Sequence, residues 1–244
     1  MNSRTEAGNL VCEFLGVFAL TLIGPGAIIA TGGQNLVAIA LALGLALGLM
    51  IAAAGHISGG VFNPAVALAL MATGKLPATR GLMYIVAQVL GGIVAAVCLV
   101  ALFPASARDA VKLGTSLPGP GVSAGQALLA EILLTFFLMF VVYGVAVDKR
   151  GPATLAGLAI GLTVTFDILM GGGVSGAAMN PARWFGPALL SGSWDAAWVY
   201  IVGPTVGAVF AAFLYNTLLL PQAEPQVAPR AREVPVDLPQ VAGD

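Results

Sequence analysis

The sequence predicts an all-α membrane protein with six transmembrane helices and two shorter, re-entrant half-helices. Hydrophobic residues make up 59% of the 244 positions and charged residues 9%, whereas a soluble domain carries about 25% charged residues. The mean hydropathy is +0.97, and the apolar residues are gathered in long segments. The tripeptide Asn-Pro-Ala also occurs twice, as Asn63-Pro64-Ala65 and as Asn180-Pro181-Ala182, each time before an apolar run too short to cross a bilayer.

Six segments can each cover a hydrocarbon core of about 30 Å, at about 1.5 Å per helical residue. They are approximately residues 9–30, 36–55, 81–103, 124–147, 153–171 and 196–219. We interpret the first as a retained membrane helix rather than a removed signal peptide, because no small-residue cleavage pattern follows it.

Two further apolar runs, at about 64–73 and 181–190, would each span only about 15 Å. Irregular backbone at membrane depth is tolerated only inside protein or beside a water-filled cavity. We therefore expect these runs to be half-helices that enter from opposite faces, meet near the middle and act together as one more crossing.

The chain also contains an internal repeat, with halves at about residues 5–110 and 122–220. The two Asn-Pro-Ala boxes are 117 positions apart, and Glu13 and Glu131 are 118 apart. Gly44 and Gly161 belong to matching small-xxx-small spacings, which let helices approach closely in lipid. Because each half has three crossings, an odd number, the second half must insert inverted relative to the first.

The basic residues predict the orientation. One side carries Arg4, Lys75, Arg80, Lys149 and Arg150, and the other carries Arg108 and Lys112. The positive-inside rule then places both termini and the first Asn-Pro-Ala loop in the cytoplasm. The last residues, 221–244, are rich in Pro, Gln and charge, so we expect a disordered cytoplasmic tail. The compact loops and the absence of a cleaved leader fit a prokaryotic inner membrane.

Several other function classes find little support in the sequence. The net charge of −1 gives no sign of a nucleic-acid partner. Cys12 and Cys98 lie in apolar segments, where thiols act as small hydrophobic groups, so we expect no disulfide and no metal site. The run from Gly171 to Gly176 lacks the Lys that a phosphate-binding loop requires. We expect no cofactor, and no nucleophile, base and orienting group are assembled for an enzyme.

The Asn-Pro-Ala box has a local structural explanation and a functional one. Asn is a strong N-cap residue and Pro suits the first helical position, so each box alone could be a plain helix start. However, an Asn that caps with its carbonyl oxygen keeps two amide hydrogens for donation. Two such donors meeting in mid-membrane, each at the positive end of a half-helix, would hold the oxygen of one passing water. Waters on either side would then point in opposite directions, which disfavours proton transfer and repels cations.

With these motifs, the chain resembles the major intrinsic protein family, the aquaporins and aquaglyceroporins, over residues 5–220. The resemblance rests on both boxes, on Gly55-His56-Ile57-Ser58-Gly59, on Arg183 with Phe185-Gly186-Pro187, and on Glu13 and Glu131. It implies an aquaporin-like channel domain at residues 1–220, passive conduction, contact with membrane lipid and a homotetramer with one pore per subunit.

The resemblance also maps the family's narrow external filter onto Leu43, Ile168, Ala177 and Arg183. Strict water channels commonly carry an aromatic residue where this chain has Leu43 and a His where it has Ile168. Glycerol facilitators typically have Asp after the filter Arg, where this chain has Trp184. Replacing bulky or polar groups by aliphatic ones should widen the ring and make it more apolar.

The remaining polar residues have supporting or open roles. We expect His56 either to hydrogen-bond within the cytoplasmic loop or to face the lumen near the inner mouth. Glu13 and Glu131 are expected to accept hydrogen bonds from the re-entrant loop of their own half, since an unpaired carboxylate in an apolar helix is costly. Asp167 should point about 100° away from Ile168. It could bond the glycine-rich outer loop, face the tetramer interface or modify the filter.

The sequence therefore predicts a passive channel for water and small uncharged solutes, such as glycerol, urea, ammonia or metalloid hydroxides, that excludes protons and ions. A strict water channel is the alternative. A secondary transporter is less favoured, because ion-coupled carriers bury carboxylate clusters along the pathway, and Arg183 is the only charge we place on the lumen. A structural membrane protein has only the Pro-rich tail in its favour.

Overall fold

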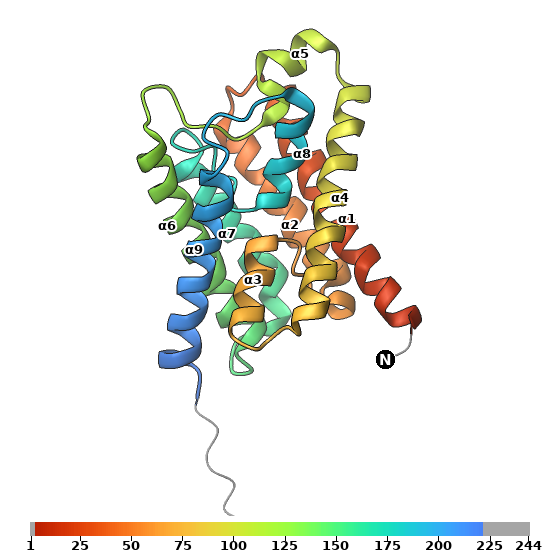
Figure 1. Ribbon diagram of the computed structural model, residues 1–244, viewed down its shortest axis with the longest axis vertical. Helices are drawn as coiled ribbons and strands as arrows, with labels where there is room; N and C mark the ends of the chain where they lie inside the picture. Colours follow the sequence, from red (N-terminus) through yellow and green to blue (C-terminus); the bar gives the residue numbers. More distant parts are fainter. Residues whose placement is uncertain (1–2, 222–244) are drawn as a thin grey trace, which may run out of the picture.

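The computed structural model describes residues 3–221, which form a bundle of long helices around two short ones (Figure 1). The first half contains α1 (Ser3–Ala30), α2 (Leu36–Ser58), α3 (Pro64–Ala72) and α4 (Ala78–Leu102). The second half contains α6 (Ala124–Val142), α7 (Ala156–Gly171), α8 (Pro181–Ser191) and α9 (Val199–Leu214). Short helical turns are α5 (Ala105–Ala110), η1 (Lys112–Gly114), η2 (Tyr143–Val147), η3 (Ala153–Leu155) and η4 (Tyr215–Leu219).

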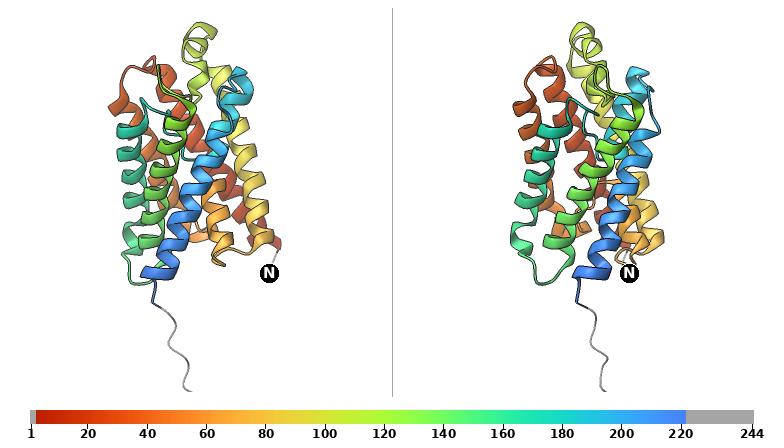
Figure 2. Two further views of the ribbon diagram at one scale, coloured as in Figure 1. Left: turned by 60° about the vertical axis from the view of Figure 1, so that its left-hand side comes forward. Right: turned by 90° about the vertical axis from the view of Figure 1, so that its left-hand side faces the viewer.

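Six helical segments within the described residues are long and apolar enough to cross a membrane. They are Thr5–Ala30, Leu36–Ser58, Ala78–Leu102, Ala124–Val147, Ala153–Gly171 and Val199–Leu219. These segments agree with the six predicted crossings to within a few residues. The predicted half-helices are α3 and α8, and they lie one above the other in the interior, between the long helices (Figures 1 and 2).

The two halves pack in the same way and interlock. Helix α1 packs against α2 and α4, and α6 packs against α7 and α9. Each half-helix lies on the last long helix of the opposite half, α8 on α4 and α3 on α9. Helix α2 packs against α7, which joins the halves a second time. Neither half-helix therefore lies wholly within its own half of the chain.

Glycines allow these helices to approach closely at equivalent places in the two halves. A β-carbon at Gly91 of α4 would lie 2.3 Å from the carbonyl oxygen of Phe14, and one at Gly207 of α9 would lie 2.2 Å from that of Ile132. Both distances are far below van der Waals contact, so only glycine fits. The matching contacts support the repeat that the sequence predicts.

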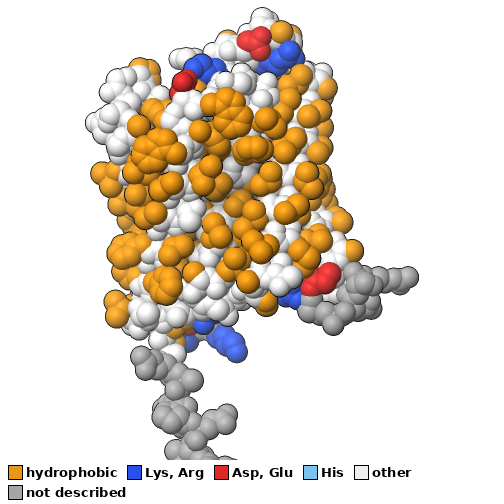
Figure 3. Space-filling model, viewed as in Figure 1, with side chains coloured by type: hydrophobic (Ala, Val, Ile, Leu, Met, Phe, Trp, Pro, Cys, Tyr) orange, Lys and Arg blue, Asp and Glu red, His pale blue; other side chains and the backbone are white. Residues whose placement is uncertain are grey.

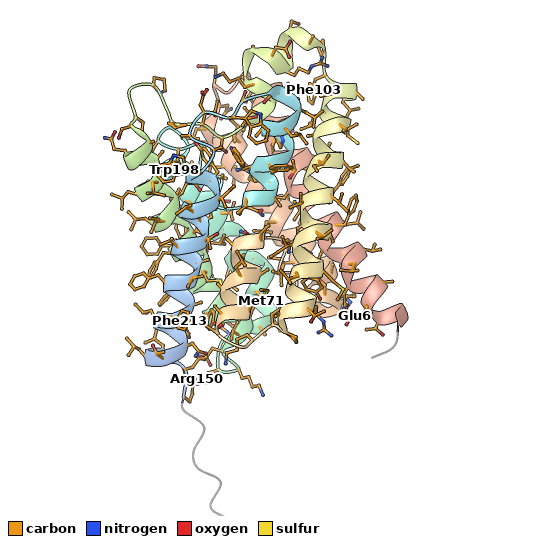
Figure 4. The ribbon with its side chains drawn as sticks, viewed as in Figure 1. Glu6, Met71, Phe103, Arg150, Trp198 and Phe213 are labelled. Atoms are coloured by element: carbon orange, nitrogen blue, oxygen red, sulfur yellow. The ribbon has the colours of Figure 1, made fainter. Side chains whose placement is uncertain are left out.

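The outer surface is that of a membrane protein. Figure 3 shows hydrophobic side chains over the middle of one face, with Lys, Arg, Asp and Glu at its two ends. Many large apolar side chains are exposed, among them Leu49, Val86, Leu158 and Phe210. Glu6 and Arg150 lie at one end of the bundle and Phe103 at the other (Figure 4). Together with the six apolar helices, this surface makes the chain an integral, multi-pass membrane protein.

One feature was not expected from the sequence, and one expectation is not tested by the structure. The connection between the halves contains a short helix, α5, and a 3-10 turn, η1, that no apolar period signals. The predicted disordered tail, residues 221–244, lies outside the described residues from position 222 onwards.

Candidate pore and its asparagine boxes

The two Asn-Pro-Ala boxes begin the two half-helices with the same local geometry. Asn63 and Asn180 have extended backbone, with φ of −159° and −148°, and each is followed by Pro at the first helical position. The side-chain oxygen of Asn63 accepts from the amide of Ala65 at 2.9 Å, and that of Asn180 accepts from Ala182 at 3.1 Å. Each Asn is thus the N-cap that its residue type favours.

The boxes are also tied directly to each other. The side-chain nitrogen Nδ2 of Asn63 donates to the backbone carbonyl of Met179 at 2.8 Å. In the same way, Nδ2 of Asn180 donates to the backbone carbonyl of Phe62 at 2.8 Å. Both acceptors have a positive φ, 52° at Met179 and 45° at Phe62, which is uncommon for residues other than glycine. This backbone conformation turns each carbonyl toward the opposite half, so the half-helices meet at their N-termini.

These hydrogen bonds between the two halves correct one expectation about the asparagines. The sequence argument left both amide hydrogens of each Asn free, but one of them is used by the carbonyl of the other half. A primary amide has two hydrogens, so each Asn retains one donor. The first hydrogen fixes the direction in which the second one points.

Two buried glutamates hold the loops that lead into the boxes. Glu13 accepts from the amides of Val61 and Phe62 at 3.1 and 2.7 Å, and from the hydroxyl of Ser58 at 2.7 Å. Glu131 repeats the pattern with Ala178 at 2.8 Å, Met179 at 2.7 Å and Ser175 at 2.7 Å. Both carboxylates are fully buried, and both bind the loop backbone of their own half.

The two glutamate sites differ in one partner. The side-chain amide of Gln88 donates to Glu13 at 2.7 Å. At the offset of 116 that relates α4 to α9, the second half has Pro204 in place of Gln88, and among the described residues no side-chain amide bonds Glu131. The second carboxylate thus has one donor fewer than the first.

A cavity of about 410 Å³ is lined by residues of both boxes. Asn63 and Asn180 line it. The four residues predicted for the filter, Leu43, Ile168, Ala177 and Arg183, line it as well, and they come from α2, α7, the loop before α8, and α8. The structure therefore brings both box asparagines and the four predicted filter residues to one cavity, although Leu43 and Arg183 are 140 positions apart in the chain. Pro64, Ala65, Pro181 and Ala182 complete the two helix starts and do not line this cavity.

The charges on this cavity differ from the prediction. Arg183 lines it, but so do Lys75 and Arg80. Arg80 forms an ion pair with Glu6 at 2.9 Å. No Asp or Glu within residues 3–221 lines the cavity. Arg183 is therefore one of three cations on the wall, and carboxylates are missing from the described part of it.

Arg183 is held on one side by acceptors. Its side chain is 3% exposed, and its Nη1 donates to the hydroxyl of Ser116 at 3.2 Å and to the carbonyls of Ala177 and Ala178 at 3.3 Å each. Because cations are disfavoured at a helix N-terminus, these oxygens offset the cost of the guanidinium there. Sequence reasoning missed Ser116, since nothing in the connection around it signals a role in the pore.

His56 and Asp167 lie elsewhere than expected. His56 is on the last turn of α2, is exposed, and lines a second pocket, mostly between α2 and α7, rather than the cavity at the asparagines. The structure thus places His56 on a helix turn next to the loop, away from the cavity that the asparagines line, and its supporting role stays a prediction. Asp167 is 1% exposed in a single subunit, so it does not face a tetramer interface. Neither of its oxygens has a hydrogen-bond partner among the described residues, and it does not line the cavity.

Comparison with known proteins agrees with this architecture. The family model described as Major intrinsic protein matches residues 1–215. The chain is 43% identical over 213 residues to Aquaporin NIP1-1 of Zea mays, covering 86% of this chain and 74% of the relative. It is 40% identical over 214 residues to Nodulin-26 of Glycine max, with coverage of 85% and 76%.

A microbial relative and a solved structure extend the comparison. The chain is 40% identical over 242 residues to a probable aquaporin, AqpM, of Archaeoglobus fulgidus, covering 88% of this chain and 98% of the relative. The X-ray structure of the aquaglyceroporin from Plasmodium falciparum superposes with a TM-score of 0.78 at 26% identity, covering 87% of this chain and 96% of the other. With its paired half-helices, its crossed asparagines and these similarities over most of its length, the chain belongs to the major intrinsic protein family of aquaporins and aquaglyceroporins.

Proposed function

We propose that this protein is a passive channel that conducts water together with small uncharged solutes, such as glycerol, urea, ammonia or metalloid hydroxides. The observation that carries the proposal is the pair of crossed asparagines on the wall of one cavity, each with one amide hydrogen left to donate. The named functions of the relatives, aquaporin and aquaglyceroporin, support the same class.

The exclusion of protons and ions follows from the same geometry. Asn63 and Asn180 offer their remaining hydrogens where the positive ends of α3 and α8 meet, each end equivalent to about half an elementary charge. A water held there by its oxygen points its hydrogens away from the asparagines. This orientation interrupts proton transfer along a single file of waters in the pore. Arg183, together with Lys75, adds positive charge that repels cations, whereas the charge of Arg80 is paired with Glu6.

The filter composition supports passage of solutes larger than water. We assign the filter to Leu43, Ile168, Ala177 and Arg183. Three of these side chains are aliphatic, so one wall offers apolar surface to a carbon chain, while Arg183 can donate to a hydroxyl or carbonyl oxygen. A strict water channel remains the alternative function, and it would need this ring to be too narrow for glycerol.

The contacts favour passive conduction over the other functions. A secondary transporter coupled to ions needs carboxylates along its pathway, yet none lines the described cavity, and both Glu13 and Glu131 are occupied by loop amides. A structural role offers no reason for two crossed asparagines on a cavity wall. We likewise propose transport rather than catalysis.

Stopped-flow light scattering on proteoliposomes tests this function. Vesicles with the reconstituted protein are exposed to gradients of an impermeant sugar, of glycerol and of urea. We expect fast water flow and glycerol uptake that does not saturate and needs no ion gradient. Fast water flow with glycerol excluded would establish the strict water channel, and uptake that requires an ion gradient would establish the transporter.

Replacing Ile168 with His tests the filter assignment. A larger, polar ring on α7 should narrow the opening and reduce glycerol flux more than water flux, because the wider permeant meets the steric barrier first. The two fluxes are measured on the same vesicles and compared with the wild type. Equal losses of both would remove Ile168 from the filter.

We also propose that the chain forms a homotetramer with one pore per subunit, which native mass spectrometry in detergent would test by its subunit number. For topology, we propose that both termini are cytoplasmic. The start of α1 and the end of α9 lie at the same end of the bundle (Figure 1), together with Arg150 (Figure 4). The expected prokaryotic inner membrane gains no support from the relatives, since two of those named above are plant proteins.

A further inference from the structure

The guanidinium of Arg183 is fixed through one nitrogen only. Nη1 has three acceptors, whereas Nε is buried without a partner. Nη2 makes no hydrogen bond to a described residue and is not among the buried unpartnered atoms, so it is the nitrogen left to the cavity that Arg183 lines. The orientation of this donor thus depends on what holds Nη1.

Ser116 supplies one of those acceptors from a distant part of the chain. It lies in the connection between the two halves, 67 positions before Arg183, and is 4% exposed. Its hydroxyl accepts from Nη1 at 3.2 Å and donates to the carbonyl of Gly176 at 3.0 Å. A hydroxyl can make both bonds at once, which an alanine at this position could not.

Trp184 holds Ser116 from the other side. Its indole nitrogen donates to the Ser116 carbonyl at 3.2 Å. The ring is buried and does not line the cavity. It stacks on Tyr200, with centroids 5.4 Å apart and planes inclined by 15°. The hydroxyl of Tyr200 in turn donates to the carbonyl of Ser175 at 2.9 Å, so the ring is anchored to the loop that carries Ala177.

A second contact ties the same connection to the same loop. The amide of Gly119 donates to the carbonyl of Val174 at 2.8 Å. A β-carbon at Gly119 would lie 2.1 Å from the carbonyl oxygen of Gly173. The connection therefore lies directly on the loop before α8, and Ser116 is held within a packed layer rather than on a free loop.

We propose that Ser116 and Trp184 are positioning residues that clamp the Arg183 guanidinium against the pore wall and thereby set the ratio of glycerol to water flux. This inference rests on the proposed channel function and adds residues to it. Without the Ser116 hydroxyl, Nη1 keeps its two carbonyl acceptors on the loop before α8 but loses its bond to the connection between the halves. The guanidinium is then held from one segment instead of two, and we expect it to enter the lumen more often. A guanidinium in the lumen obstructs a wide solute more than it obstructs water.

The test measures glycerol and water permeability on the same proteoliposomes for Ser116→Ala and Trp184→Phe. Phe keeps an aromatic ring that can stack on Tyr200 and removes the indole donor together with part of the buried ring. Loss of a hydrogen bond to a charged group should lower the glycerol-to-water ratio by about threefold to tenfold in Ser116→Ala, with a smaller change in the same direction in Trp184→Phe. Ser116→Thr, which retains the hydroxyl, should restore the wild-type ratio.

Two control variants separate this clamp from a general loosening of the connection. Ser191→Ala removes the partner of Thr115, the neighbour of Ser116, without touching Arg183. Trp198→Phe changes a half-exposed indole that makes no hydrogen bond to a described residue. Both controls should keep the wild-type ratio. A ratio that falls equally in the Ser191→Ala control, or that fails to recover in Ser116→Thr, would overturn the proposal.

A double-mutant cycle shows whether the effect passes through Arg183. Ser116→Ala is measured again in an Arg183→Val background, where we expect it to leave the ratio unchanged because there is no guanidinium to release. The same drop in both backgrounds would refute the clamp. A wild-type protein that conducts neither water nor glycerol would instead refute the proposed function, so the two failures are distinguishable.

Discussion

At the scale of single residues, the buried carboxylates show how partners decide the effect of a charge. Glu13 and Glu131 each accept from two backbone amides and a serine hydroxyl, so their cost of burial in lipid is offset by strong hydrogen bonds. Asp167 is equally buried but has no such partner among the described residues. A buried carboxylate therefore stabilises the loop backbone at Glu13 and Glu131, whereas at Asp167 it destabilises the fold.

Glu131→Gln should destabilise the protein more than Glu13→Gln does. A glutamine offers one acceptor oxygen and a donor amide, so one loop amide loses its acceptor in either half, at a cost of about 1–3 kcal/mol. Beside Glu13, the oxygen of Gln88 is buried without a partner, and it can accept from the new amide after a rotation. Near Glu131, the equivalent residue is Pro204, whose side chain has no oxygen to accept from the new amide. Thermal unfolding of both variants in detergent measures the difference, and a larger loss for Glu13→Gln would contradict it.

Asp167→Asn, unlike the two Glu→Gln variants, should not lower the stability of the protein. Because a buried, unpaired carboxylate is costly in a membrane interior, the neutral amide of nearly the same shape should unfold at the same temperature as the wild type or at a higher one. Differential scanning fluorimetry in detergent provides the measurement. A drop of several degrees would mean that Asp167 has a partner, such as a bound water, that its protein neighbours do not reveal.

At the scale of helices, the pore depends on how closely α2 and α7 approach. A β-carbon at Gly44 would lie 2.5 Å from the carbonyl oxygen of Gly161, and one at Gly157 would lie 2.6 Å from that of Gly48. Association in lipid relies on such packing rather than on a hydrophobic drive between helices. Because α2 contributes Leu43 and α7 contributes Ile168 to the cavity wall, the width of the filter is set partly by this crossing.

Gly157→Ala should therefore lower both stability and flux. The added methyl group meets backbone rather than a flexible side chain, and such overpacking typically costs about 1–3 kcal/mol. Water permeability per reconstituted protein and the unfolding temperature should both fall. Gly55→Ala on α2 is the matched control, because its β-carbon would find only ordinary contact, with Ile51 at 3.5 Å. Similar losses in both variants would argue that the crossing itself is not responsible.

At the scale of the whole molecule, the end of the last helix is fastened to the connection between α6 and α7. Arg150 donates to the carbonyl of Leu219 at 2.7 Å and forms an ion pair with Asp148. Hydrogen bonds from Arg150 lower the pKa of Asp148 to about 2. Since that pKa is depressed, this contact contributes above the usual carboxyl pKa and is lost only as the pH falls toward 2, so it persists over the physiological range.

A chain that ends at Pro221 should conduct as the full chain does. The cavity, both asparagine boxes and the Ser116 contacts all lie within residues 3–221, and the last described turn, η4, is held by Arg150. Water and glycerol permeabilities of the truncated and full-length proteins, normalised to the protein in the vesicles, should agree. A truncated protein that reconstitutes as an intact oligomer but conducts differently would show that residues 222–244 act on the pore.

The sequence by itself determined the features that depend on neighbours within a turn or on apolar length. The six crossings follow from runs of apolar residues long enough for a bilayer, and both half-helix starts follow from the capping chemistry of Asn and Pro. The inverted repeat is readable because matching residues recur at nearly constant offsets. These are local properties, and local rules suffice for them.

Only the tertiary structure decided which groups meet across the interlocked halves. One hydrogen of Asn63 is taken by Met179, 116 positions away, and Arg183 rests on Ser116. His56 lies in a last turn of α2 that extends beyond the predicted span, and Asp167 lies buried without a hydrogen-bond partner among the described residues, although its helix is predicted well. The physical reason is that each half-helix packs on the opposite half, so the partners of a pore residue are set by the relative placement of distant helices, which no short-range pattern encodes.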